Sequence, residues 1–169
     1  MLELLLGFVL FLLGCLYGNF VEWFVHRYIL HALAKRMKNF RPLSFHLQEH
    51  HVATLKNDYR DPSYTNDPMW TVNPKTLEFF GILGMALPHV VLFWVSIPFA
   101  IGTLFWIAFH YFAHVISHVR PDIGKKYFRV HYDHHMGGDM EKNFTVTVPV
   151  MDYLFGTRKK FSGSKSTNK

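Results

Sequence analysis

The sequence predicts an all-α integral membrane protein, a helical bundle with a histidine-rich dimetal site at its cytoplasmic face. Half of the 169 residues are hydrophobic, and they concentrate in residues 1–34 and 77–118. The segments between these blocks are polar and rich in His, Asp and Lys. Eleven of the twelve histidines form four clusters, each at or just beyond the end of an apolar segment. We expect about three to four membrane helices in a single domain over residues 1–160, followed by a disordered tail over 161–169.

The first membrane helix is expected to begin at the N-terminus. Residues 2–21 are mostly apolar and long enough to cross a hydrocarbon core of about 30 Å. The helical pattern continues to about Lys35, so a helix of roughly 50 Å would carry His26 and His31 beyond the apolar core. This N-terminus lacks the positive region and small-residue cleavage site of a signal peptide. We therefore expect an uncleaved anchor.

The second apolar block, residues 75–118, is long enough for two membrane helices joined by a turn. The turn is expected near Ser96, Pro98 and Gly102, because proline disfavours helix in the residue before it. A turn nearer Pro88 is the alternative. The returning helix ends in FHYFAHVISH, so its histidines come back to the side of the first cluster.

The remaining segments are polar. In residues 42–74, HLQEHH is expected on a short helix and NDYRDPSYTNDP in turns and loops. In residues 119–169, VHYDHH follows a basic stretch, and NFTVTVPVMDYLFGT is expected to form extended chain followed by a short amphipathic turn. The single cysteine, Cys15, excludes an internal disulfide.

Charge placement predicts the orientation in the membrane. The formal net charge is +6, and the cations flank the apolar segments, as in the cluster Lys35, Arg36, Lys38 and Arg41. The positive-inside rule then puts the metal site and the C-terminus on the cytoplasmic side. Contact with anionic lipid explains these cations better than nucleic acid, so no nucleic-acid partner is expected.

The four histidine clusters carry the candidate chemistry, because polar groups near a bilayer are costly and usually functional. His89 stands alone and is expected not to be a ligand. The clustered residues, all candidate metal ligands, are His26 and His31, then His46, His50 and His51, then His110, His114 and His118, and finally His131, His134 and His135.

Spacing within the clusters indicates how they could bind metal. On a helix, the three histidines of HYFAHVISH lie on one face, and a pair four residues apart can chelate one ion. The adjacent His134 and His135 cannot share a helix face and could reach two different ions. The same holds for the adjacent His50 and His51 of HLQEHH. His26 and His31 lie about 140° apart on an ideal helix, so they require different ions or a local distortion.

The number of histidines favours two ions. Imidazole suits Fe, Zn, Cu or Ni. A single zinc site needs only three or four ligands, so about ten histidines indicate a two-metal site. Three carboxylates lie near the clusters and are expected to accept hydrogen bonds from metal-bound imidazoles, namely Glu22, Glu49 and Asp133.

Four histidine boxes in the order HX4H, HX3HH, HX3H and HX2HH, followed by NFTVTVPVMDYLFGT, resemble the fatty acid hydroxylase superfamily of membrane di-iron enzymes. The resemblance runs from about Phe24 to Thr157. Met151 stands where the family's WDxLFGT-like ending usually has Trp. The resemblance implies ten ligands, with His118 an additional candidate: His26, His31, His46, His50, His51, His110, His114, His131, His134 and His135.

The resemblance also implies two Fe ions, which Zn can replace in the isolated protein, and O2-dependent hydroxylation or desaturation of a lipid C–H bond. A fatty acyl lipid is the first expectation, and a carotenoid or sterol is the alternative for the same chemistry. Nothing like a fused cytochrome b5 domain is present, so a separate donor of the cytochrome b5 or ferredoxin type is expected. A non-catalytic membrane metal-binding protein is the alternative of another class. A transporter would place polar groups along a path near the midplane, whereas the histidines here gather on one side, which argues against transport.

Overall fold

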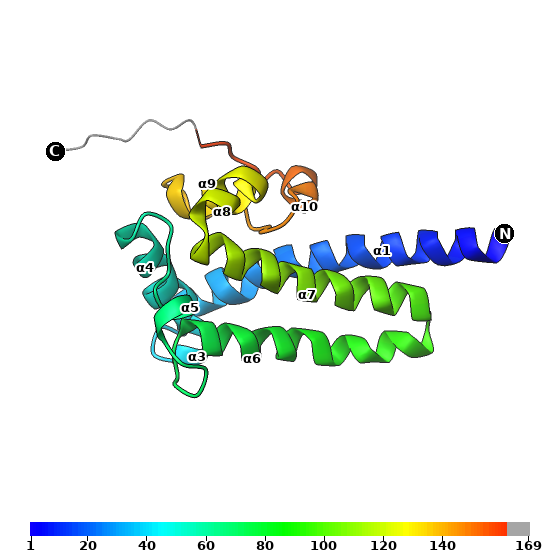
Figure 1. The fold of residues 1–169 in the computed structure, drawn as a ribbon, viewed down its shortest axis with the longest axis horizontal. Helices are drawn as coiled ribbons and strands as arrows, with labels where there is room; N and C mark the ends of the chain where they lie inside the picture. Colours follow the sequence, from blue (N-terminus) through cyan, green and yellow to red (C-terminus); the bar gives the residue numbers. More distant parts are fainter. Residues whose placement is uncertain (162–169) are drawn as a thin grey trace.

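The computed structural model describes residues 1–161, and every regular element in this range is a helix. The long helices lie side by side, and shorter helices gather at one end of them (Figure 1). Three helices in the described range are long and apolar enough to cross a membrane: Leu2–Arg36, Pro74–Trp94 and Ile97–Val119. The prediction of an all-α membrane bundle is confirmed, with three membrane helices. Apart from Phe161, the predicted tail lies outside the described residues.

The first membrane helix is continuous but changes its winding. It consists of α1 (Leu2–Phe24), a π-helical segment η1 (Val25–Leu33) and the short α2 (Ala34–Arg36). The first two turns of α1 expose large apolar side chains, as a lipid-facing surface requires, and its buried residues begin at Gly14. The predicted continuation of this helix to about Lys35 is confirmed.

The second apolar block forms a hairpin of α6 (Pro74–Ala86), the 3₁₀ segment η3 (Leu87–Trp94) and α7 (Ile97–Val119). Pro88 lies at the start of the 3₁₀ segment, where its missing N–H removes a helical hydrogen bond. Ser96 caps α7 by accepting a hydrogen bond from the N–H of Phe99 at 3.4 Å. The turn therefore lies at Ser96, as predicted, and not at Pro88.

Glycines bring α1 and α7 into close contact. A Cβ added to Gly102 would lie 2.1 Å from the carbonyl oxygen of Phe11, and one added to Gly14 would lie 2.2 Å from that of Phe99. The hydroxyl of Thr103 donates to the carbonyl oxygen of Gly14 at 3.3 Å. Small residues allow such close backbone approach in membrane helices. This contact holds the histidines of α7 beside those of η1.

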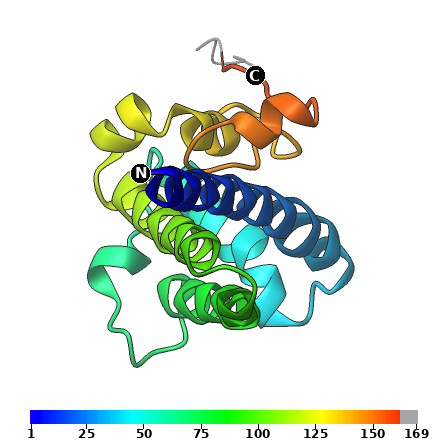
Figure 2. The ribbon, with the colours of Figure 1, turned by 90° about the vertical axis from the view of Figure 1, so that its right-hand side faces the viewer.

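The histidine-bearing end is built from short helices. One nearly continuous helix comprises α3 (Arg41–Phe45), the π-helical η2 (His46–His50) and α4 (His51–Lys56). Figure 2 shows the segment containing α8–α10 on one side of α1 and the hairpin on the other. The other short helices are α5 (Ser63–Asn66), α8 (Pro121–Tyr127), α9 (Arg129–Met136) and α10 (Val150–Leu154).

The segment NFTVTVPVMDYLFGT is anchored by one buried carboxylate. Asp152 accepts hydrogen bonds from the backbone N–H of Phe144 at 2.8 Å and of Thr145 at 2.9 Å. It also accepts from the hydroxyl of Thr157 at 2.6 Å, which in turn accepts from Trp23 Nε1 at 3.0 Å. The segment is thereby tied to α1, next to the histidines of η1.

Candidate metal centre

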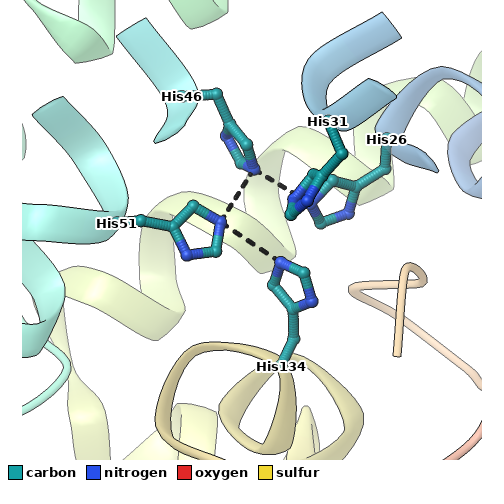
Figure 3. A group of neighbouring side chains, drawn as sticks. All are labelled: His26, His31, His46, His51 and His134. Atoms are coloured by element: carbon teal, nitrogen blue, oxygen red, sulfur yellow. Dashed lines mark hydrogen bonds between the residues drawn. The ribbon is translucent and has the colours of Figure 1, made fainter. Parts of the chain in front are cut away.

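Five buried histidines from three parts of the chain form the first group: His26, His31, His46, His51 and His134. One nitrogen of each ring lies within 4.8 Å of the equivalent atoms of the other four. Figure 3 shows the rings pointing toward a common centre. The Nε2 atom of His46 lies 2.9 Å from that of His26 and 3.1 Å from that of His51, and the last lies 3.2 Å from Nε2 of His134.

The two π-helical segments explain how these side chains meet. A π-helix closes its hydrogen bonds over five residues, so two residues five apart lie closer to one helix face than they would in an α-helix. Within η1 this brings His31 onto the face of His26, with ring centroids 5.0 Å apart. At η2 it brings His51 onto the face of His46. The local distortion expected for His26 and His31 is therefore present.

A second group contains His50, His114, His118 and His135, all buried and also within 4.8 Å of one another. His131 lies beside this group. Its Nε2 is 2.9 Å from Nε2 of His118, and its ring centroid is 4.5 Å from that of His135.

The two groups are adjacent because neighbouring histidines divide between them. His51 belongs to the first group and His50 to the second, and His134 and His135 divide in the same way. The rings of His51 and His135 stack with centroids 4.3 Å apart. The fold therefore provides two neighbouring nitrogen-rich sites.

Most of these rings are oriented by an acceptor at Nδ1. An Nδ1–H that donates to a carbonyl or carboxylate leaves Nε2 with its lone pair free to bind a metal. Backbone carbonyl oxygens accept from His26 (Phe144, 2.6 Å), His134 (Lys142, 2.7 Å) and His118 (Tyr59, 2.8 Å). The carboxylate of Asp61 accepts from His50 at 2.7 Å, and the hydroxyl of Tyr64 accepts from His114 at 3.3 Å, with a carboxylate oxygen of Glu78 2.7 Å from the same nitrogen.

Several buried ring nitrogens have no hydrogen-bond partner among the described residues. They include Nε2 of His31, His50 and His135. A buried polar atom without a partner is costly, and one cation bound in each group would satisfy all three. Two imidazoles on one ion at about 2.1 Å place their nitrogens about 3 Å apart when the angle between them is near 90°. The observed Nε2 separations of 2.9 to 3.2 Å fit this arrangement.

Burial keeps the extramembrane histidines of the site neutral. It lowers the pKa of His134 to about 4 and holds the pKa values of His51 and His135 well below their ordinary value of 6.5. Neighbouring imidazoles lower the pKa values of His51 and His135 further. Neutral imidazole is the form that binds a metal ion.

Two predicted ligands lie outside both groups: His131, which lies beside the second group, and His110. His110 is one turn before His114 on α7, and its Nδ1 lies 3.4 Å from Glu22 without hydrogen-bond alignment. Glu22 accepts instead from Trp106 Nε1 at 2.9 Å and from the N–H of Thr147 at 3.1 Å. Only the C-terminal end of α7 reaches the groups, so His118 is included in the second group and His110 is not.

Two carboxylates expected to support histidines have other partners. Glu49 receives two hydrogen bonds from Arg41, at 2.7 and 2.8 Å, on the surface. Asp133 is buried but pairs with Arg129 at 2.7 Å and Arg158 at 2.8 Å. Sequence proximity placed both near histidines, but their side chains point elsewhere. Among the described residues, neither side chain bonds to a histidine.

The carboxylates that do support imidazoles were missed in the sequence. Glu78 is an acid near the start of the apolar stretch 77–94, and an acid within a membrane segment is itself a signal of function. It also accepts a hydrogen bond from Tyr64. Asp61 carried no such signal, because it lies in a loop rich in Asn, Asp and Pro.

The site opens onto an apolar cavity with a volume of about 140 Å³. Four histidines of the two groups contribute to its wall, and the rest is mainly aliphatic. Residues from η1, α3 and α6 form this aliphatic part, among them Val25, Ile29, Leu43, Ile82 and Met85.

The family model described as fatty acid hydroxylase matches residues 11–157. This range contains every histidine of both groups and the segment anchored by Asp152. No curated protein and no solved structure matches the chain. The chain belongs to the fatty acid hydroxylase family.

Proposed function

We propose that this protein is a membrane di-iron oxygenase that hydroxylates or desaturates a C–H bond of a lipid, foremost a fatty acyl lipid. The observation that supports the proposal is the convergence of buried imidazoles in two adjacent groups beside an apolar cavity. The proposed ligands of one ion are His26, His31, His46, His51 and His134. Those of the other are His50, His114, His118, His131 and His135.

When bound, two iron ions would supply the O2 activation that an unreactive C–H bond requires. The chain supplies the rest. Asp61 and Glu78 orient their imidazoles, burial keeps water from the ligands, and the aliphatic wall binds the apolar part of the lipid.

The proposed reaction balances only with an external electron donor. In hydroxylation one oxygen atom enters the new C–O bond, while the other accepts two electrons and two protons and leaves as water. In desaturation two hydrogen atoms leave the substrate and both oxygen atoms become water with the same two electrons and two protons. A separate protein of the cytochrome b5 or ferredoxin type is the proposed donor.

We further propose that the metal site and the C-terminus lie on the cytoplasmic side. The cations that follow the first membrane helix, Lys35, Arg36, Lys38 and Arg41, stand at the histidine-bearing end. Positive charge next to a membrane helix favours the cytoplasmic side.

Expression in a host of defined lipid composition tests the activity. Lipid extracts are compared by mass spectrometry for the full chain and for His50→Ala and His134→Ala, which each remove one proposed ligand. A lipid that gains one oxygen supports hydroxylation, and one that loses two hydrogens supports desaturation. Each change should depend on O2 and be absent from both variants.

Gln48→Ala is the matched control, because Gln48 is exposed on the same helix as His50 and bonds only to the carbonyl oxygen of Lys38. It should retain the lipid product. A chain that holds metal but alters no lipid class, including carotenoids and sterols supplied to the host, would favour the non-catalytic metal-binding protein.

A further inference from the structure

A second cavity adjoins the one at the histidines. It has a volume of about 340 Å³ and is lined by α1, η1, α6 and η3. Val25 and Met85 line both cavities. The two cavities therefore share part of their wall, and together they follow the first membrane helix and the ascending arm of the hairpin; we name them the α1–α6 groove.

The α1–α6 groove leads away from the histidines along the membrane helices. Its lining on the first membrane helix extends from His26 in η1 back to Tyr17 in α1, nine residues earlier, or about 14 Å at 1.5 Å per residue. Phe24, Gly84 and Pro88 line it and are exposed, so the groove is open along its side. On a membrane helix that exposed side faces lipid tails.

Two glycines of α6 keep the groove wide. Gly81 lines the histidine cavity and Gly84 lines the second cavity, and a Cβ added to either would meet no atom within 4 Å. Gly14 and Gly102, in contrast, are needed for close helix packing. Glycine costs about 1 kcal/mol relative to alanine inside a helix. At Gly81 and Gly84 no packing contact explains that cost, whereas open space for a ligand does.

A polar pair stands at the far end of the groove. The hydroxyl of Tyr17 donates to Nε2 of His89 at 3.3 Å, and His89 Nδ1–H donates to the carbonyl oxygen of Met85 at 2.7 Å. This pair links α1 to η3 across the groove. An apolar chain that extended past this pair would have to break the hydrogen bond between Tyr17 and His89.

We propose that the α1–α6 groove binds the non-reacting apolar chain of the substrate, that Gly84 leaves room for this chain, and that the Tyr17–His89 pair limits its length. The groove accommodates roughly a dozen carbon–carbon bonds, because an extended chain advances about 1.2 Å per bond. Only the identification of this chain as part of a substrate rests on the proposed function.

Photolabelling tests the groove without turnover. The full chain, purified in lipid nanodiscs without added metal, is exposed to saturated fatty acids of increasing length that carry a diazirine at the methyl end. Labelled peptides are then mapped by mass spectrometry. The labelled position should move from the histidine cavity toward Tyr17 and His89 as the probe lengthens, and should advance no further with longer probes.

Gly84→Leu should reduce labelling at Tyr17 and His89 by about tenfold or more, the lower end of what a hydrophobic pocket achieves against added bulk. Labelling near Gly81 should persist. Leu83→Phe is the matched control, because Leu83 is exposed on the same helix and lines neither cavity. Met85→Ala widens the junction between the cavities and should increase labelling at the far end.

Equal labelling of the Gly84→Leu and Leu83→Phe proteins, or labelling that is independent of probe length, would overturn the proposal. If Gly84→Leu does not fold, an unchanged pattern in Met85→Ala overturns it in the same way. If the expressed chain oxidises no lipid in cells but the labelling still depends on probe length, the proposed function is rejected and the proposed binding groove is supported.

Discussion

At the scale of single residues, the site depends on which nitrogen of each imidazole is free. Carbonyl, carboxylate or hydroxyl oxygens accept from Nδ1 of His26, His50, His114, His118 and His134. Each acceptor selects the tautomer whose Nε2 lone pair faces the group. The acceptors therefore matter almost as much as the ligands, and mutation of such partners typically lowers metal affinity by about 10- to 100-fold.

Asp61→Ala should weaken one metal site selectively. Asp61 is 2% exposed, and it supports His50 in the second group but no histidine of the first. Metal analysis during titration with a chelator should show one ion lost at about 10- to 100-fold lower chelator activity than in the unmodified chain.

Glu49→Ala is the control for this experiment, because Glu49 pairs only with Arg41 at the surface. It should retain both ions. Equal weakening of the two ions in Asp61→Ala would contradict the assignment of His50 to one group.

At the scale of elements, two features position the histidines. The π-helical segments change which residues share a helix face, and the glycine contact holds α7 against α1. The π-helical segments carry proposed ligands themselves, whereas the glycine contact contains none. Both set the backbone from which the ligands project, so a change in either should affect both groups together.

Gly102→Val should destabilise the bundle and weaken metal binding. The new Cβ would lie 2.1 Å from the carbonyl oxygen of Phe11, so α7 must move away from α1. Overpacking typically costs about 1–3 kcal/mol, and here the obstacle is backbone rather than a flexible side chain. Thermal unfolding in detergent, with metal content measured in parallel, should show both losses.

Ile101→Phe adds bulk at the neighbouring position, which is 48% exposed, and should leave stability and metal content unchanged. A Gly102→Val protein with unaltered melting and full metal content would show that the helices do not need this close approach.

At the scale of the whole molecule, the fold buries many neutral imidazoles in its interior. Burial lowers the pKa of His134 to about 4 and keeps those of four other extramembrane histidines well below 6.5: His46, His50, His51 and His135. In the unfolded chain these side chains would titrate near 6.5. The unfolded state therefore binds more protons than the folded state between these values.

The metal-free protein should accordingly lose stability as the pH falls from about 6.5 toward 4. Above pH 6.5 both states are neutral at these positions, so this contribution to stability is fully present there. Chemical unfolding in detergent at a series of pH values measures the effect. A free energy of unfolding that is constant over this range would contradict the burial of these rings in the metal-free state.

Much of this protein could be predicted from its sequence. Apolar length predicted the membrane helices, Ser96 and the prolines predicted the hairpin turn, and the histidine boxes predicted the family. The partners of Glu49 and Asp133 could not be predicted, because a side chain's direction depends on the helix it faces. Asp61 was missed for the same reason, since only the folded chain brings its loop to His50.

By itself, the sequence determined that three apolar stretches form helices and that histidines follow their ends, because helix length and residue order are local properties. Only the tertiary structure decided the membership of each group. The helix winding at His31 and His51 places these two rings in the first group. The close contact between α1 and α7 sets which end of α7 reaches the groups, so that His118 is included and His110 is not. These are properties of packed backbones, and no spacing rule for a regular α-helix contains them.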